Sequence, residues 1–261
     1  MNGSGIYMKN MVEVSNVIKE YGRGASSFRV LKEISLEIRE GEFVAIMGPS
    51  GSGKTTMLNV MSTIDKVNSG RIKIDGREIT RINDNQLADF RRKVIGFVFQ
   101  DFNLLDNMTI KDNIALPLTL SNENYDDILK KIKELTKLLG ISGQLEKYPY
   151  ELSGGQRQRA AICRALITYP KVIFADEPTG ALDTKSTADV LECFEKINKT
   201  LGTTIVMVTH DAAAASHCDR IMFLRDGQFA GRLDSNGDKK AMFKKALSML
   251  EVMEATDNEF R

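Results

Sequence analysis

The stretch "GPSGSGKT", residues 48–55, decides the fold that this sequence predicts. It follows the short apolar run "FVAIM" (43–47) and opens the stretch "TTMLNVMSTI" (55–64), whose apolar residues have helical spacing. The pattern G-x-x-x-x-G-K-[ST] between a buried strand and a helix is typical of a loop that binds phosphate groups with its backbone N–H groups. Glycines are needed because the chain must adopt torsions that other residues avoid. The sequence therefore predicts a phosphate-binding loop.

The ligand expected at this loop is ATP with Mg²⁺. The Lys54 ammonium would neutralise the β and γ phosphate oxygens, and the Thr55 hydroxyl would bind the metal ion. A mere glycine turn is the structural alternative, and the flanking strand and helix disfavour it. The residues of this loop that we expect to contact ATP are Gly48, Pro49, Ser50, Gly51, Ser52, Gly53, Lys54, Thr55 and Thr56.

A second segment, "ELSGGQRQR" (151–159), also has the character of an anion site. Small residues with free N–H groups at a helix N-terminus favour an anion, and the helix macrodipole adds to this. A helical insert separates the segment from the first loop, so we do not expect it to reach the phosphate of its own chain. A second copy related by a two-fold axis would bring it there. The sequence thus predicts a homodimer in which the partner's ATP is bound by Ser153, Gly154, Gly155 and Gln156.

Length and charge fit one globular chain without a nucleic-acid partner. The 261 residues are 42% hydrophobic and 27% charged, as in one large domain or one domain with a sizeable insert. A formal net charge of +1 gives no basic field that would attract DNA or RNA. Cys163, Cys193 and Cys218 have no C-x-x-C spacing, so we expect buried, reduced thiols. His217 lies in no functional pattern and is predicted on the surface.

No segment has the features of a membrane span or a secretion signal. Residues 1–14 contain no apolar core, and the longest apolar run, "IALPL" (114–118), holds a proline and is far shorter than a spanning helix. We therefore expect a soluble, cytoplasmic protein.

The apolar runs predict a mainly parallel sheet. "VLKEISLEI" (30–38) alternates in hydrophobicity and predicts a half-exposed strand. Helical segments precede the last two of the other predicted strands, and strands that alternate with helices are typical of an α/β fold with both sheet faces covered. Besides 43–47, these strands are expected at 70–76, 94–100, 171–177, 203–210 and 220–227.

Two helical regions stand apart from this alternation. Residues 125–140, "YDDILKKIKELTKLLG", place apolar side chains on one face and end at Gly140, so about 101–170 is predicted to be a helical insert. Residues 234–261 have near-helical apolar spacing, and we expect a C-terminal amphipathic helix that packs on the domain. Its predicted packing face consists of Met242, Phe243, Ala246, Leu247, Leu250 and Met253.

Two carboxylates end the predicted strand "KVIFADE" (171–177). Ligands bind at the carboxyl ends of the strands in sheets of this kind. Asp176 suits a role at Mg²⁺, either as a direct ligand or as a residue that hydrogen-bonds to the ligands of the metal. Glu177 suits a general base that orients or deprotonates the attacking water. An ordinary acidic turn before a proline is the alternative.

Four further residues are weaker signals on their own. Gln100 and His210 end predicted strands, and Asp183 lies in "TGALDTKS". We expect His210 to contact the γ-phosphate and Gln100 to contact Mg²⁺ and water, although a lone histidine is more often structural. Tyr21 precedes the phosphate-binding loop, where its ring is placed to stack on a purine. A tyrosine at a strand end, in the core or on the surface, is the alternative.

With these residues in this order, the chain closely resembles the nucleotide-binding subunits of ABC transporters over about residues 11–233. "LSGGQ" combined with a phosphate-binding loop is highly specific for that family. The resemblance implies a P-loop NTPase fold with a RecA-like parallel-sheet core, an antiparallel β edge subdomain and a helical subdomain. It also implies a role for each matching residue. By this resemblance Tyr21 stacks on the adenine, Gln100 forms the Q-loop, Glu177 is the catalytic base and His210 is the switch histidine. Asp183 forms the D-loop, which together with the "LSGGQ" residues binds the ATP of the partner chain.

Longer stretches narrow the resemblance. "ADEPTGALDTKS" (175–186) and "FVFQDFNLLDNMTIKDNIALPL" (97–118) are similar to macrolide-efflux, lipoprotein-release and antimicrobial-peptide-resistance ATPases. "STIDKVNSG" (62–70), "FNLLD" (102–106) and the C-terminal helix are most similar to bacitracin-export, or Bce-type, ATP-binding proteins. This implies an ATPase on the inner face of the cell membrane that drives an integral membrane permease, with a sensor histidine kinase reached through that permease. "FNLLDNM" (102–108) is the segment expected to receive the permease's coupling helix. A place for these side chains in the core of the helical insert is the alternative.

Other functions fit the sequence less well. The nearest alternative is the ATPase of a lipoprotein-release or macrolide-efflux complex. A soluble P-loop phosphotransferase would not need "LSGGQ". ABC-type ATPases of DNA repair separate the two loops by long coiled coils, and those of translation carry two ATPase domains, whereas this chain has neither feature. A binding-only protein is disfavoured because Lys54, Glu177 and His210 are all of the active type.

Overall fold

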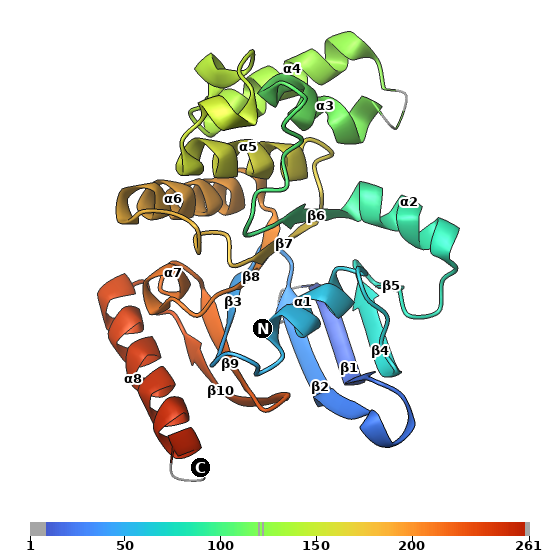
Figure 1. Cartoon of the computed structure of the whole chain (residues 1–261), viewed down its shortest axis with the longest axis vertical. Helices are drawn as coiled ribbons and strands as arrows, with labels where there is room; N and C mark the ends of the chain where they lie inside the picture. The colour runs from blue at the N-terminus through green and yellow to red at the C-terminus, as the bar shows by residue number, and fades with distance from the viewer. Residues whose placement is uncertain (1–8, 120, 122, 259–261) are drawn as a thin grey trace, which may run out of the picture.

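The computed structural model describes residues 9–119, 121 and 123–258, which form two sheets and several helices (Figure 1). The six-stranded sheet has the order β10-β9-β3-β8-β7-β6, and the four-stranded sheet has the order β2-β1-β4-β5. The strands are β1 (Asn10–Tyr21), β2 (Phe28–Arg39), β3 (Phe43–Met47), β4 (Ser69–Ile74), β5 (Arg77–Glu78), β6 (Ile95–Val98), β7 (Val172–Asp176), β8 (Thr204–Val208), β9 (Arg220–Arg225) and β10 (Gln228–Asp234). The α-helices are α1 (Lys54–Met61), α2 (Asp84–Val94), α3 (Ile110–Thr119), α4 (Tyr125–Leu138), α5 (Gly154–Leu166), α6 (Thr184–Leu201), α7 (Ala212–Ala215) and α8 (Lys239–Asn258).

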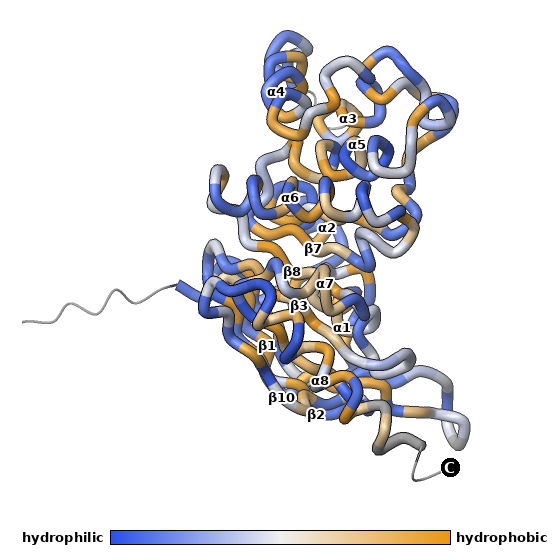
Figure 2. The backbone as a smooth tube through the Cα atoms, turned by 90° about the vertical axis from the view of Figure 1, so that its left-hand side faces the viewer, coloured by the Kyte–Doolittle hydropathy of each residue, from blue (hydrophilic) through white to orange (hydrophobic). Residues whose placement is uncertain are grey.

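Strand β3 lies inside the six-stranded sheet, parallel to β8 on one side and to β9 on the other. All five of its residues are buried. Phe43, Ala45 and Met47 face one hydrophobic cluster, and Val44 and Ile46 face the other. A strand covered on both faces must be apolar throughout, which explains the continuous run "FVAIM". Figure 2 shows the same hydrophobic character along the neighbouring strands β7 and β8.

The four-stranded sheet is antiparallel and packs against α1 on the second cluster. In β2, buried and exposed residues alternate from Ile34 to Arg39. The predicted half-exposed strand at 30–38 is therefore correct, and it extends to Phe28 and Arg39. This sheet is the antiparallel β subdomain that the resemblance implied.

Helices α3, α4 and α5 follow β6 and precede β7, and they gather at one end of the molecule (Figure 1). The Asn124 side chain accepts a hydrogen bond from the Asp126 N–H and so caps the start of α4. Gly140, with φ of 67°, follows its C-cap as predicted. The inserted stretch is thus helical, and its boundaries at about 101 and 170 stay a prediction.

The C-terminal helix α8 packs on the domain through Met242, Ala246 and Met253, which are buried. The prediction that Leu247 also lies on this packing face is wrong, because 42% of the residue is exposed. It follows Ala246 directly, and successive residues are rotated by about 100° around a helix, so Leu247 turns toward solvent. Residues 259–261 of the predicted extension lie outside the described residues.

Two further side-chain predictions need correction. His217, predicted on the surface, is half-buried because its Nδ1 lies 2.5 Å from the Glu195 carboxylate on α6. Cys163 and Cys218 are buried thiols as predicted, whereas Cys193 is only half-buried. Burial raises the pKa of Cys193 and Cys218, so both stay protonated.

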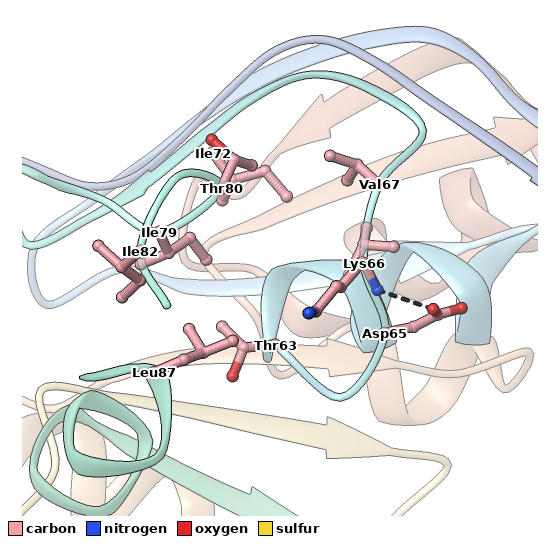
Figure 3. A pocket seen from close by; sticks show the side chains of 10 residues that line it. Thr63, Asp65, Lys66, Val67, Ile72, Ile79, Thr80, Ile82 and Leu87 are labelled. Atoms are coloured by element: carbon pink, nitrogen blue, oxygen red, sulfur yellow. Dashed lines mark hydrogen bonds between the residues drawn. The ribbon is translucent and has the colours of Figure 1, made fainter. Parts of the chain in front are cut away.

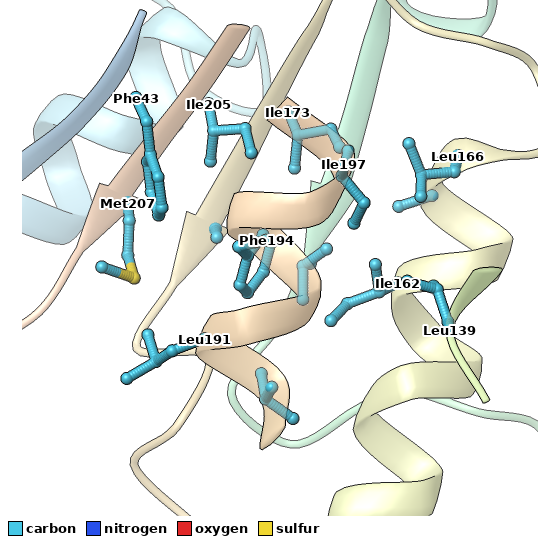
Figure 4. Close-up of a cluster of buried hydrophobic side chains, with 14 of the residues drawn as sticks. Phe43, Leu139, Ile162, Leu166, Ile173, Leu191, Phe194, Ile197, Ile205 and Met207 are labelled. Carbon is cyan, nitrogen blue, oxygen red and sulfur yellow. The ribbon is translucent and has the colours of Figure 1, made fainter. Parts of the chain in front are cut away.

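Helix α6 fills the space between the parallel sheet and α5 (Figure 4). The Phe194 ring on α6 is fully buried, and its centroid lies 6.2 Å from that of Phe43 on β3. Ile162 and Leu166 on α5 cover the other side of this helix. The helical segment is therefore joined to the sheet through one continuous apolar layer.

Replacing Phe194 by alanine should lower the free energy of unfolding by about 3–5 kcal/mol, because the lost contacts and the cavity both destabilise the native state. Urea denaturation followed by circular dichroism measures this change. Tyr125→Ala is the control: its ring is 61% exposed, so the change should stay within about 0.5 kcal/mol. Equal losses in the two variants would contradict this account of the core.

Candidate functional site

A cavity of about 560 Å³ lies where strands of the parallel sheet end and α1 begins. It brings together side chains from distant parts of the sequence. Its lining consists of Tyr21, Phe28, Val30, Ser50, Gly51, Gly53, Lys54, Thr55, Thr56, Gln100, Glu177 and His210. The edge of the sheet that the sequence predicted for ligand binding is therefore the edge that is hollowed.

The loop between β3 and α1 depends on glycine at two positions. A Cβ on Gly48 would lie 2.0 Å from the Leu224 carbonyl oxygen of β9, which no side chain tolerates. Gly53 has φ of 101° and is the N-cap of α1. This turn directs the first backbone N–H groups of α1 and its positive dipole end into the cavity, where they favour an anion.

Lys54 is the cation beneath this anion site. Its side chain is buried, and its Nζ donates to the carbonyl oxygens of Gly48 and Pro49 at 2.8 and 2.9 Å. Burial lowers the pKa of Lys54, and the carboxylates of Glu177 and Asp176 act in the opposite direction. The ammonium group is thus held within the loop and lines the cavity, where its charge suits an anionic ligand.

A hydroxyl and a carboxylate lie side by side at the start of α1. The Thr55 Oγ1 donates to Oδ1 of Asp176 at the end of β7, over 3.3 Å. Burial raises the pKa of Asp176, whereas the hydrogen bond from Thr55 lowers it. Oxygen donors of this kind are the ligands that Mg²⁺ prefers, so the pair fits a magnesium ion.

Glu177 and His210 both line the cavity, and their side chains are in contact. His210 Nδ1 lies 2.8 Å from Glu177 Oε2. The Glu177 side chain is 16% exposed, whereas that of His210 is 70% exposed. Glu177 has φ of 45°, in the left-handed region, and its N–H donates to the Val208 carbonyl of β8. The fold holds Glu177 in an uncommon conformation that aims its carboxylate at the cavity.

Two lining residues were missed by the sequence analysis. Phe28 and Val30 of β2 stand beside Tyr21, and the ring centroids of Tyr21 and Phe28 are 6.1 Å apart. Phe28 is 59% exposed. The one signal for Phe28 is that a large aromatic side chain stands at a strand position exposed to solvent. A single sequence does not show which strand positions are exposed, so this signal could not be used.

The predicted partner-chain residues do not line this cavity. Ser153 caps α5 by accepting a hydrogen bond from the Gln156 N–H, and Asp183 caps α6 in the same way through Ser186. A Cβ on Gly155 would lie 2.9 Å from Ser186 Cβ, so the two helix starts pack closely. Among the predicted loop residues, Gly48, Pro49 and Ser52 also stay outside the lining, as does Asp176.

A protein-family model described as ABC transporter matches residues 31–180, more than half of the chain. The chain belongs to the ABC transporter family. The bacitracin export ATP-binding protein BceA of Halalkalibacterium halodurans is 47% identical to this ABC protein over 95% of the chain and 99% of the relative. The ABC transporter ATP-binding protein YxdL of Bacillus subtilis is 48% identical over 97% of the chain and 98% of the relative.

A solved structure has the same fold as this ABC protein. It is the dimeric post-hydrolysis state of the ATP-binding cassette MJ0796 bound to ADP and Pi, with a TM-score of 0.80 and 40% identity over 87% of the chain and all of the cassette. The predicted α/β P-loop NTPase fold is therefore confirmed. The prediction that the chain is an ATP-hydrolysing subunit of an ABC transporter is confirmed as well. No helix in the described part of the chain has the length and apolar character needed to cross a membrane.

Proposed function

We propose that this ABC protein hydrolyses ATP with Mg²⁺ in the cavity at the end of the parallel sheet, as one half of a homodimer that drives a membrane permease. The observation that carries the proposal is the cavity itself, which gathers Lys54 and Thr55 from the start of α1 with three residues that follow the ends of strands β6, β7 and β8, namely Gln100, Glu177 and His210. Each of these side chains offers the chemistry that one part of ATP hydrolysis needs.

The phosphates lie along the loop at the start of α1 in this proposal. Lys54 contacts the β and γ oxygens, and the N–H groups of the loop surround them. Thr55 and Gln100 hold Mg²⁺, with Asp176 behind Thr55 at 3.3 Å. The metal ion, when bound, offsets the negative charge that builds up on the phosphate oxygens.

Water activation belongs to Glu177 in this proposal, and His210 helps to orient the γ-phosphate. The 2.8 Å contact between the two side chains supports a shared task. The adenine stacks on Tyr21, beside Phe28, at the far side of the cavity.

The second anion site serves the partner's ATP. Ser153, Gly154, Gly155 and Gln156 stand outside the chain's own cavity, next to the Asp183 turn. Supporting this arrangement, the related cassette MJ0796 has a dimeric structure. A homodimer then encloses two ATP molecules, each held by one loop from each chain.

Glu177→Gln should keep ATP bound and slow hydrolysis by about 10²- to 10⁴-fold, because a neutral amide cannot accept the proton of the attacking water. Phosphate release and fluorescent ATP binding measure the two effects. Lys54→Ala is the comparison, and it should lose ATP binding itself. Near-normal turnover by Glu177→Gln would remove this residue from the role of base.

Gly154→Asp should prevent dimer formation while ATP binding to the monomer stays nearly intact. A carboxylate placed against a γ-phosphate costs several kcal/mol, enough to remove an association of about micromolar strength. Light scattering in the Glu177→Gln background measures ATP-driven dimerisation.

Gly154→Asn is the matched control, since it has the same shape without the charge and should dimerise far better. A Cβ at this position would lie 3.1 Å from the flexible end of Leu182, and its other neighbours, the Ala181 carbonyl oxygen and Phe102 Cζ, are at an ordinary contact distance of 4.0 Å. Should Gly154→Asp weaken monomer binding as much as Lys54→Ala does, the second anion site would belong to the chain's own ATP.

The permease is proposed to dock in a groove of about 570 Å³ between the helical segment and α2. Of the predicted segment 102–108, only Asn103 lines it, because Leu104 packs into the core. The lining combines apolar and cationic side chains, which suits an amphipathic segment with acidic residues. Its main members are Arg91, Arg92, Phe97, Phe99, Leu116, Pro117 and Arg164.

Exchanging both exposed arginines of the groove, Arg91→Glu with Arg92→Glu, should reduce copurification with the permease by about tenfold or more, because like charges would meet across the interface. ATP binding to the isolated chain should not change. Lys130→Glu with Lys133→Glu on α4 makes the same charge change outside the groove and serves as the control. Equal copurification of the two double variants would contradict this docking site.

The biological task is proposed to be resistance to bacitracin-like peptides. The similarity to BceA over nearly the full length of both chains supports this. The protein then acts in the cytoplasm, at the inner face of the cell membrane through its permease, and a sensor histidine kinase is reached through the same permease.

A further inference from the structure

The ring of Tyr21 is held at its hydroxyl by a carboxylate from another part of the chain. The Tyr21 hydroxyl donates to Asp65 Oδ2 over 2.7 Å. Asp65 lies in the turn that joins α1 to β4, and its Oδ1 also accepts the Lys66 backbone N–H at 2.7 Å (Figure 3). The carboxylate is therefore fixed by the backbone of its own turn before it meets the tyrosine.

Lys19 completes this arrangement from the same strand as Tyr21. Its Nζ donates to Asp65 Oδ1 and to the Lys66 carbonyl oxygen, both at 2.7 Å, and only 8% of the residue is exposed. The ammonium lies over the Tyr21 ring, 4.7 Å from the centroid. One face of the ring is thus covered by Lys19, which leaves the other face for a planar ligand.

The charges of this cluster favour a lasting hydrogen bond. Burial raises the pKa of Tyr21 and the bond to Asp65 raises it further, whereas a hydrogen bond with the Thr56 side chain lowers it. On balance the pKa is raised, so the hydroxyl stays a donor. Burial also acts to raise the pKa of Asp65, but the bonds from Lys19, Tyr21 and the Lys66 N–H outweigh it and lower the pKa. Asp65 remains an ionised acceptor.

We propose that Asp65, together with Lys19, is a positioning residue that fixes the plane of the Tyr21 ring for the adenine of ATP. This inference rests on the proposed function, in which Tyr21 stacks on the base. A ring whose orientation is already set loses less conformational freedom when the base arrives, so the bound state is favoured. Asp65 does not line the nucleotide cavity, and it acts only through the tyrosine.

The turn that carries Asp65 has other anchors, so the carboxylate can be changed without releasing it. The Asn68 N–H donates to the Ile18 carbonyl at 2.9 Å, and the Asn68 side-chain oxygen accepts the Glu20 N–H at 2.9 Å. Both bonds join the turn to β1 independently of Asp65.

The test is Asp65→Asn in the Glu177→Gln background, with Mg²⁺-ATP and Mg²⁺-tripolyphosphate titrated by calorimetry. We expect ATP affinity to fall about fivefold, on the scale of one ordinary net hydrogen bond, because an asparagine at this position can still accept from the tyrosine hydroxyl without the charge. Affinity for tripolyphosphate, which has no base, should not change. In the Glu177-containing protein, Asp65→Asn should raise KM for ATP and leave kcat unchanged.

A double-mutant cycle separates positioning from a general structural role. Tyr21→Phe removes the hydroxyl that Asp65 holds, so adding Asp65→Asn to it should cause little further loss of ATP affinity. The double variant should bind about as well as either single variant. Losses that multiply, or an equal loss for tripolyphosphate, would overturn the inference.

Asp84→Asn is the matched control. Asp84 accepts from Lys66, the residue after Asp65, at the same 2.7 Å distance, but both side chains are exposed and neither residue lines the nucleotide cavity. It should bind ATP as the parent does. Tyr21→Ala tests the proposed stacking of adenine on Tyr21, on which the inference rests. If this variant binds ATP as the parent does, the stacking proposal fails. If Tyr21→Ala weakens ATP and Asp65→Asn does not, only the positioning role fails.

Discussion

The site depends on one steric constraint, the close approach of the Gly48 backbone to strand β9. The Leu224 carbonyl occupies the place where a side chain at this position would start. Because β3 is clamped between β8 and β9, its end cannot move aside to make room. The chain must therefore turn into α1 within a few residues, and the start of that helix is brought to the carboxyl edge of the sheet. Lys54 and Thr55 reach the cavity only because this turn is so tight.

Elements buried on both faces could be predicted from the sequence because burial leaves a local pattern. Strand β3 is apolar throughout, and β7 and β8 are apolar except for Asp176 at the end of β7 and Thr204 at the start of β8. Each of the three was expected within about two residues of its observed bounds. Strands β1 and β10 and helix α2 leave weaker patterns. In β10, exposed and half-buried residues alternate with no fully buried one, and α2 buries only Leu87 and Phe90. Their place is set by tertiary packing, which one sequence does not display.

In the site, too, residues with a local sequence pattern could be predicted, and residues placed by tertiary packing could not. Residues in a fixed local pattern, such as Lys54 and Thr55, could be located because the turn itself requires them. Tyr21 could be suggested only by its order in the chain, and Phe28 and Val30 not at all. Their positions follow from the pairing of β1 with β2, where Tyr21 faces Phe28 in the ladder. The bond from Tyr21 to Asp65 spans two elements that are remote in sequence, and no local pattern encodes it.

The helix that carries Ser153 is tied to the nucleotide cavity by a buried amide. Gln158 on α5 is fully buried, and its Nε2 donates to the carbonyl oxygens of Phe99 at 3.2 Å and Pro178 at 2.7 Å. Phe99 precedes Gln100, and Pro178 follows Glu177, so one side chain connects α5 to both sides of the cavity. Arg164, one α5 turn and a half further on, donates to the carbonyls of Phe102 and Asn103. Because buried hydrogen bonds are costly to leave unmade, α5 cannot shift without moving these segments too. A displacement of the segments at Gln100 or Glu177 is therefore transmitted to α5, which carries the loop that we propose for the partner's ATP, through direct bonds as well as through the apolar core.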